Sequence, residues 1–307
     1  MSNQIVVIGS SNTDMIVKMP RIPQPGETIL GGKFSTAAGG KGANQAVAAA
    51  RAGGNVTFVA CLGRDMFGDQ ALQGFQQDGI QVEHVVKDAD APSGVALIFV
   101  DEKGENSIAV ASGANANLSA EDIQNAADTI ASADMVLMQL EIPLATVQAA
   151  ARIAADNHAK VILNPAPAQA LPDELLQQVT LLTPNETEAE LLTGIKVETE
   201  TQAAEAARAL QAKGVETVII TLGPRGAYVL SSDYEGLIPS FKVKAVDSTA
   251  AGDVFNGVLA VSLAEGLPIP DAVRLANAAA ALSVTKLGAQ PSAPTRQEIE
   301  NFLNDKN

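Results

Sequence analysis

The chain has 307 residues, 47% of them hydrophobic, which is enough to bury a large core. Its 20 Lys and Arg against 35 Asp and Glu give a net charge of −15, and without any basic run this argues against nucleic acid or an anionic membrane surface as a partner. The N-terminal segment lacks the basic region of a signal peptide, and no apolar stretch reaches membrane-spanning length. We therefore expect a cytoplasmic protein.

The residues that most often carry nucleophilic or metal chemistry are scarce. The single cysteine, Cys61, lies in an apolar run and is more consistent with a core residue than with a nucleophile. The two histidines, His84 and His158, stand away from the glycine-rich stretches. A Ser-His-Asp triad, a Cys-His pair and a histidine metal site therefore all have little support. Carboxylates must supply any acid–base chemistry.

The first part of the chain mixes one buried strand with extended pieces. Residues 4–9 are a short β-branched run that predicts a buried strand, followed by a polar turn over residues 10–14. Three extended segments interrupt the strand–helix order: residues 15–19, 27–34 and the predicted hairpin 94–110. We assign these segments to a small β layer or lid formed by about residues 14–35 and 93–112.

From residue 119 onward, predicted strands and helices alternate with short connections. The predicted strands are residues 135–140, 161–164, a strand near 181, and 217–221, followed by an extended segment at 227–230. The predicted helices begin at residues 143, 173, 187, 199, 270 and 295. This alternation predicts an α/β fold with a doubly wound, mostly parallel sheet. We expect one main domain over residues 1–307.

A first glycine-rich stretch, residues 38–44 (AGGKGAN), opens an alanine-rich helix. Its three glycines let the backbone approach a ligand, and Lys41 and Asn44 add hydrogen-bond donors suited to sugar hydroxyls. A tight turn with close helix packing explains the glycines equally well. Neither a P-loop nor a dinucleotide fingerprint is present.

A second stretch, residues 247–257 (DSTAAGDVFNG), passes from small residues into a helical apolar pattern. Asp253 is predicted to lie where this helix begins. Free N–H groups and the positive end of the helix dipole would hold a phosphate or an oxyanion, and the carboxylate would accept a proton from a hydroxyl. The alternative, favoured for this residue taken alone, is that Asp253 only caps the helix.

Polar residues follow two predicted strands. Asn12 and Asp14 lie after the first strand, where ligands bind in open parallel sheets, although such residues more often make local hydrogen bonds in a turn. Gln139 and Glu141 lie at the end of a later strand. Glu141 is equally well explained as an exposed acid near the N-terminus of the following helix.

Two more polar segments follow later strands. Asn185 and Glu188 have the spacing of a helix capping box, which is the favoured interpretation of this pair taken alone. Residues 221–226 (TLGPRG) form either an ordinary turn or a loop that wraps the phosphates of a nucleotide.

Taken together, these stretches resemble the ribokinase/PfkB family of sugar kinases, and the resemblance covers nearly the whole chain. Its two signatures are residues 38–44 and residues 247–253, in order and about 200 residues apart. The resemblance implies a three-layer α/β/α domain with a mostly parallel central sheet and a small β-sheet lid. It also implies ATP-dependent phosphorylation of D-ribose to D-ribose 5-phosphate, with ATP, Mg²⁺ and K⁺ as cofactors.

The resemblance also implies roles for particular residues. Asp253 would be the catalytic base, with an anion hole at Ala250, Ala251, Gly252 and Asp253. The sugar would be held by Asn12, Thr13, Asp14, Gly40, Lys41, Gly42, Ala43, Asn44, Glu141 and Asp253. The nucleotide would be bound by Asn185, Thr221, Leu222, Gly223, Pro224, Arg225, Gly226, Gly252, Asp253 and Asn277. Glu188 would act on Mg²⁺ through water, and K⁺ would be held by Asp247, Thr249, Ser283, Lys286, Gly288 and Ser292, with Lys286 contributing only its carbonyl.

The resemblance further implies a homodimer formed through the lid, which would cover exposed strand edges. Two alternatives remain for the function. The first is a deoxyribokinase or another sugar kinase of the same family, because one hydroxyl separates the substrates. The second is a sugar-binding protein without turnover.

Overall fold

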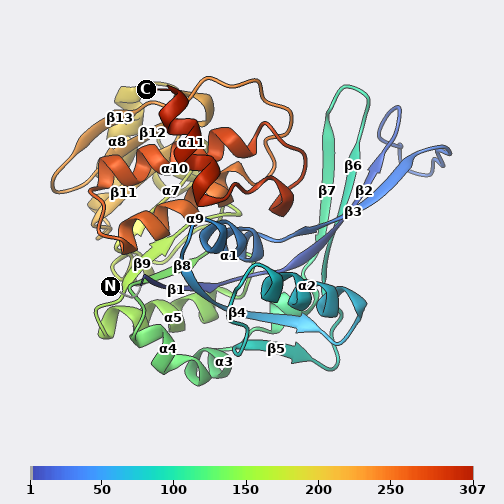
Figure 1. Ribbon diagram of the computed structural model, residues 1–307, viewed down its shortest axis with the longest axis horizontal. Helices are drawn as coiled ribbons and strands as arrows, with labels where there is room; N and C mark the ends of the chain where they lie inside the picture. Colours follow the sequence, from blue (N-terminus) through green and yellow to red (C-terminus); the bar gives the residue numbers. More distant parts are fainter. Residues whose placement is uncertain (1–2, 307) are drawn as a thin grey trace.

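The computed structural model describes residues 3–306, whose strands form two separate sheets (Figure 1). The main sheet has nine strands in the order β13-β12-β11-β10-β9-β8-β1-β4-β5. Their bounds are β1 (Gln4–Ile8), β4 (Asn55–Gly63), β5 (Val85–Asp88), β8 (Met135–Met138), β9 (Lys160–Leu163), β10 (Leu181–Leu182), β11 (Thr217–Thr221), β12 (Ala227–Leu230) and β13 (Glu235–Ile238). Strands β5 to β11 are parallel in this order, and β12 and β13 continue the sheet in antiparallel pairing.

Helices cover both faces of the main sheet. Along β1, Ile5 and Val7 belong to one buried hydrophobic cluster, while Val6 and Ile8 belong to another on the opposite face, as the two-residue repeat of a strand requires. The helices are α1 (Lys41–Arg51), α2 (Met66–Gln77), α3 (Ala120–Asn125), α4 (Ala127–Ala131), α5 (Leu144–Asp156), α6 (Asp173–Leu176), α7 (Glu186–Thr193), α8 (Glu200–Gln211), α9 (Ala251–Ala264), α10 (Ile269–Ser283) and α11 (Arg296–Lys306). The predicted three-layer α/β/α fold is confirmed.

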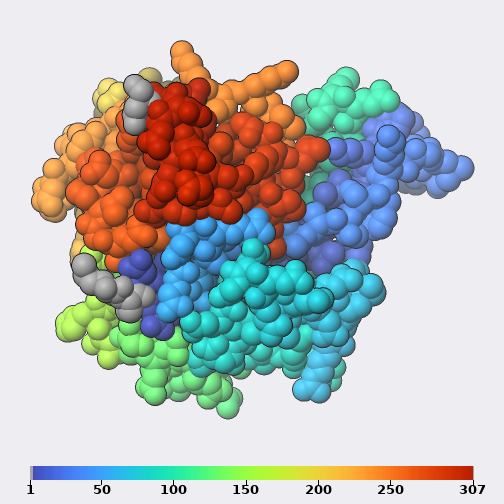
Figure 2. Space-filling view, in the orientation of Figure 1, coloured from blue at the N-terminus to red at the C-terminus, as the bar shows by residue number. Residues whose placement is uncertain are grey.

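The second sheet has four strands in the order β3-β2-β6-β7 and extends beside the main body, at the right of Figures 1 and 2. Its strands are β2 (Asn12–Lys18), β3 (Lys33–Gly39), β6 (Gly94–Val100) and β7 (Asn106–Ala111). The hairpin predicted within residues 94–110 is present as β6 and β7. Large apolar side chains are exposed on this sheet at Phe34, Leu97, Ile108 and Val110.

Two details of this second sheet were predicted wrongly. The polar residues 12–14 are the start of β2 rather than part of a turn, because β3 and β6 pair with them on both sides and satisfy their backbone groups. The extended segment expected at residues 27–34 becomes a strand only at Lys33 and runs to Gly39. Gly31, with φ of 90°, takes a backbone conformation that breaks a strand before this point.

Within residues 3–306, no helix combines the length and the apolar character needed to cross a membrane. The cytoplasmic location stays a prediction.

Candidate active site

A cavity of about 800 Å³ opens where several strands of the main sheet end. Asn164 follows β9, Thr183 and Asn185 follow β10, and Thr221 ends β11; all four line the cavity. The first residues of α9 form another part of its wall. The carboxyl ends of parallel strands are the usual place for ligands in open α/β sheets, so this cavity is the candidate ligand site.

Asp253 lies at the third position of α9 and is 6% exposed. The residue that caps this helix is Ala250, with φ of 61°, and it makes no side-chain capping bond. The Asp253 carboxylate instead accepts hydrogen bonds from Asn44 Nδ2 at 2.9 Å and from Gln45 Nε2 at 3.0 Å. The alternative that Asp253 serves only as a helix cap is therefore wrong, because its two oxygens are turned to α1.

The N-terminus of α9 is open to the cavity. The first N–H groups of a helix have no partner within the helix, and here no capping side chain takes their place. Ala251 N–H contacts Ser248 O at 3.3 Å, so Gly252 and Asp253 carry the free donors. A Cβ added to Gly252 would meet no protein atom within 4 Å, although this residue lines the cavity. The missing side chain therefore leaves room for a ligand against the helix end.

Charged groups of opposite sign, the ammonium of Lys41 and the carboxylates of Asp253 and Glu188, lie near the N-terminus of α9. Burial raises the pKa of Asp253, and Lys41, Asn44 and Gln45 oppose this shift. Burial also raises the pKa of Glu188, which is 6% exposed. Burial lowers the pKa of Lys41, but the negative charges of nearby carboxylates, first Asp253 and then Glu141 and Glu188, outweigh it and raise the pKa overall. Lys41 thus stays a cation beside Asp253.

The glycine-rich turn packs directly on the segment after β1. A Cβ on Gly42 would lie 2.5 Å from Ser10 N, and one on Gly40, whose φ is 88°, would lie 2.7 Å from Asn12 N. The tight-turn interpretation is thus correct. The same close approach places the first residues of α1, including Lys41 and Asn44, beside Asp253, so the turn also builds the site.

Two of the predicted sugar-binding residues line a second cavity, of about 370 Å³. Asn12 and Glu141 line this cavity. Glu141 Oε2 accepts from Lys41 N at 3.0 Å and from Ser10 Oγ at 2.5 Å. Glu141 is therefore not an acid of α5's first turn, as the alternative held; its carboxylate contacts the N-terminus of α1 instead.

Asp14 and Asn44 each have a feature suited to a polar ligand. Burial, followed by the negative charges of Glu141 and Asp253, raises the pKa of Asp14 to about 6. Asn44 Oδ1 is buried without a hydrogen-bond partner among residues 3–306, and so is available as an acceptor. Asp14 and Asn44 line neither cavity, and the same holds for four further predicted sugar residues: Thr13, Gly40, Gly42 and Ala43.

Most predicted nucleotide residues line the larger cavity: Asn185, Thr221, Gly223, Pro224, Gly226, Gly252, Asp253 and Asn277. Two do not. Leu222 is buried in the hydrophobic core, and Arg225 forms an ion pair with Glu186 at 3.0 Å. The capping box of α7 is also present, because Asn185 and Glu188 exchange side-chain to backbone hydrogen bonds at 2.8 Å each.

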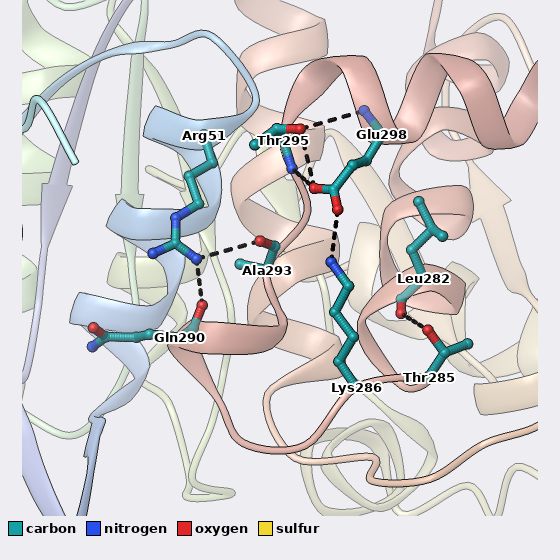
Figure 3. A network of polar contacts seen from close by, with 8 residues as sticks. All are labelled: Arg51, Leu282, Thr285, Lys286, Gln290, Ala293, Thr295 and Glu298. Atoms are coloured by element: carbon teal, nitrogen blue, oxygen red, sulfur yellow. Dashed lines mark hydrogen bonds and ion pairs between the residues drawn. The ribbon is translucent and has the colours of Figure 1, made fainter.

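Three of the residues predicted for K⁺ are joined by hydrogen bonds through Asp247, in the segment before α9. Asp247 Oδ1 accepts from Thr249 N–H and Oγ–H, and its Oδ2 accepts from Gly288 N–H at 2.9 Å. The Lys286 side chain points away to Glu298, 2.8 Å from its carboxylate, as Figure 3 shows. Lys286 can therefore offer this region only its carbonyl oxygen.

The remaining predicted K⁺ residues lie in α10 and the following loop. Ser283 Oγ and Ser292 Oγ donate to the backbone carbonyls of Ala280 and Ala289. Figure 3 also shows Arg51, at the end of α1, donating to the carbonyls of Gln290 and Ala293 in this loop. The loop is thus fixed to the helix whose other end carries Lys41 and Asn44.

Sequence reasoning missed four buried polar residues of the site: Gln45, Asn115, Gln139 and Asn164. Asn115 Nδ2 donates to Asn12 Oδ1 at 2.8 Å and so orients that side chain. Gln139 was noted at a strand end without a role. Polar residues at strand ends and at the buried face of a helix were the only available signal, because their partners are far away in sequence.

The cavity, the open helix N-terminus and the buried carboxylate beside a lysine define an α/β protein built for group transfer to a hydroxyl. The family model "pfkB family carbohydrate kinase" matches residues 2–296, so the chain belongs to this family of carbohydrate kinases.

Similar proteins agree with this membership. The chain is 48% identical to a ribokinase of Haemophilus influenzae over 99% of each protein, and 39% identical to a deoxyribokinase of Salmonella typhi over 97% of this chain and 98% of the relative. Among solved structures, Arabidopsis thaliana ribokinase complexed with ribose and ATP is 34% identical, with a TM-score of 0.90 and 99% of each chain covered.

Proposed function

We propose that this protein is a ribokinase, which transfers the γ-phosphoryl group of ATP to the 5-hydroxyl of D-ribose. The observation that carries the proposal is Asp253, a buried carboxylate held by two amide donors at an open helix N-terminus. Relatives named ribokinase that are 42–48% identical over nearly the full chain support the substrate.

In the proposed reaction, the ribose hydroxyl oxygen attacks the γ-phosphorus while its proton passes to Asp253. The bond between the γ-phosphorus and the β–γ bridging oxygen breaks, and ADP leaves with that electron pair. Negative charge on the transferring group faces the free N–H groups of Gly252 and Asp253 and the ammonium of Lys41. Phosphoryl transfer depends mainly on such positioning and charge neutralisation.

The sugar is proposed to lie between the two cavities. Asn12 and Glu141 line the smaller cavity, and together with Asp14 and the free Oδ1 of Asn44 they would supply polar groups for its hydroxyls. The four-stranded sheet, which contributes Asn12 and Asp14 directly, would serve as a lid over the bound sugar. The apolar side chains exposed on that sheet suit a homodimer that pairs two lids, since large exposed apolar groups favour association.

ATP fits the larger cavity, whose volume of about 800 Å³ suits a nucleotide. Mg²⁺ commonly keeps water and substrate phosphates as ligands, so Glu188 alone is a sufficient protein contact, acting through water. Bound Mg²⁺ would neutralise phosphate charge. The oxygen-rich set at Asp247, Thr249 and residues 283–292 fits K⁺, held largely by backbone carbonyls.

The test is ADP formation with MgATP and K⁺ against ribose, 2-deoxyribose, fructose, adenosine and 2-keto-3-deoxygluconate. We expect ribose to have the highest kcat/KM. Asp253→Asn should lower kcat by at least about 100-fold, the scale of general-base catalysis, while sugar binding stays nearly intact. Unchanged turnover in that variant would refute the assigned base.

The second candidate is a deoxyribokinase, which the relative in Salmonella typhi favours at 39% identity. The two substrates differ by the 2-hydroxyl, so discrimination depends on few contacts. A higher kcat/KM for 2-deoxyribose would support this candidate with the same mechanism. If no sugar reacts, a binding protein without turnover becomes the better explanation.

A further inference from the structure

Three buried amide side chains link the main sheet to Asp253. Gln139, just after β8, donates from Nε2 to Gln45 Oε1 at 2.6 Å. Gln45, in α1, donates from Nε2 to Asp253 Oδ1 at 3.0 Å and to Asn164 Oδ1 at 3.1 Å. Gln45 and Gln139 are both fully buried. The carboxylate therefore connects to the sheet through hydrogen bonds that solvent does not reach.

This network fixes which way the Gln45 amide faces. Its oxygen accepts one hydrogen bond, and its two N–H groups are both donated. A reversed amide would place Oε1 against the Asp253 carboxylate and Nε2 against the donor of Gln139. Asn164 is oriented in turn, because its Nδ2 donates to Thr183 O at 3.2 Å. Gln139 and Asn164 thus both favour the orientation in which Gln45 presents a donor to Asp253.

The buried side chain of Gln139 contains a polar atom that lowers the stability of the folded protein. Its Oε1 is buried with no hydrogen-bond partner among residues 3–306, a situation that is unfavourable in a protein core. The chain also requires a glycine beside it, since a Cβ on Gly9 would lie 2.1 Å from that oxygen. An apolar residue at position 139 would avoid the unpaired buried oxygen. The Nε2 group of Gln139, which donates to Gln45, is therefore the functional part of this side chain.

We propose that Gln45 is a positioning residue for Asp253 and that Gln139 acts through Gln45, holding the carboxylate in place to accept the proton of the sugar hydroxyl. This inference rests on the proposed function, because it assumes that Asp253 accepts the proton. Asn44 holds the other carboxylate oxygen, so loss of Gln45 would leave the base attached at one point only.

The test compares Gln45→Met and Gln139→Met with the wild type, since methionine keeps the length of the side chain and removes its donor. We expect kcat with ribose to fall about 10- to 100-fold in Gln45→Met, the effect of losing a hydrogen bond to a charged group, and less in Gln139→Met. KM for ribose should change by less than about threefold, because neither residue is proposed to touch the sugar. The acid limb of the kcat profile should move to higher pH, because hydrogen bonds from Gln45 lower the pKa of Asp253.

The control is Thr57→Val, which removes a fully buried hydroxyl from β4 that contacts Gln81 and not Asp253. This variant should lower Tm only, and the pH profile of kcat should stay the same as in the wild type. In the double variant, Gln139→Met should have no further effect on kcat, because its partner is already lost. Additive losses, or wild-type pH profiles in both single variants, would overturn the inference.

A measurement on the wild type covers the case in which the variants do not fold. The side-chain amide protons of Gln45 should shift in NMR spectra as Asp253 titrates, and this shift should vanish in Asp253→Asn. A Gln45 amide signal that does not respond to that titration would overturn the inference. If wild-type enzyme turns over no sugar, the proposed function fails; if it is active and the Gln variants match it, only the present inference fails.

Discussion

Glu141 Oε2 accepts the backbone N–H of Lys41 at 3.0 Å, although 100 residues of sequence separate the two. The residue in the N-cap position of α1 is Gly40, which has no side chain to fill this role. Glu141 therefore supplies the negative charge that the N-terminus of α1 favours. The same contact joins a predicted sugar-binding carboxylate to the glycine-rich turn, so the two parts of the sugar site depend on each other.

We expect Glu141→Gln to weaken both stability and sugar binding. Loss of the charge at the helix N-terminus should lower the free energy of unfolding by about 0.3–1 kcal/mol. KM for ribose should rise about tenfold or more, because a charged hydrogen-bond acceptor is lost. Chemical denaturation and steady-state kinetics measure the two effects. The control is Glu121→Gln, an exposed acid in the first turn of α3 that should leave KM unchanged; an unchanged KM in Glu141→Gln would contradict the sugar-binding role.

We expect Gly252→Ala to stabilise the protein and impair it as an enzyme. The residue is helical, and a Cβ there meets no protein atom, so alanine should raise the free energy of unfolding by about 0.5–1 kcal/mol. The same methyl group would enter the cavity where the transferring phosphoryl group is proposed to lie. kcat should therefore fall at least tenfold. Thermal melts and ADP release test both parts, and a stable variant with full activity would remove Gly252 from the anion hole.

The sequence determined the fold class because strand and helix periods are local properties. The β-branched run of β1 and the regular alternation after residue 119 predicted the main sheet. The prediction of the second sheet was less accurate. Residues 12–14 were expected in a turn but form a strand, because they pair with β3 and β6. Such pairing depends on partners that lie far away in the chain.

Prediction of the site was limited in the same way, because some of its residues depend on partners far away in the chain. Asp253 and Lys41 lie in two recognisable glycine-rich stretches, and the structure brings them together. Gln45 and Gln139 carry only a weak local signal, as polar residues on a helix face and at a strand end, because their role depends on contacts with each other and with Asp253. Arg225 was expected at the nucleotide; it does not line the cavity itself, but it pairs with Glu186, which does.

Asp14 gives a prediction about pH. Burial and neighbouring negative charges raise its pKa from 3.8 to about 6 in the folded protein, so the native state binds more protons than the unfolded state between these values. The contribution of Asp14 to stability is therefore present at low pH and is lost as pH rises through about 6. Asp14→Asn should raise Tm relative to wild type at pH 7–8 and much less at pH 4.

The same variant should bind ribose more weakly at pH 7–8, because it loses a charged acceptor. Wild-type affinity for ribose should fall below about pH 6, whereas the affinity of Asp14→Asn should stay flat there. Calorimetric titrations across pH 5–8 measure this difference. The control is Asp90→Asn, an exposed loop residue that should follow wild type in both properties. A Tm difference for Asp14→Asn that does not depend on pH would contradict the assigned shift.

The last prediction concerns K⁺ and Lys286. We expect K⁺ to raise kcat well above the value in Na⁺, because Asp247, which contacts Gly288, and the carbonyls of the loop at residues 288–292 are proposed to hold the cation. Lys286→Met should keep this dependence, since the side chain is paired with Glu298 (Figure 3) and the residue is proposed to contribute only its backbone carbonyl. Loss of this exposed ion pair should lower stability by no more than about 1 kcal/mol.

Asp247→Asn is the matched variant that should lose the K⁺ response, because it removes the charge that the cation would meet. Rates measured in K⁺, Na⁺ and a large organic cation at equal ionic strength separate specific activation from screening. Equal rates in K⁺ and Na⁺ for the wild type would count against a cation site. A lost response in Lys286→Met would show instead that the ammonium group itself matters, against the geometry in which it turns away to Glu298.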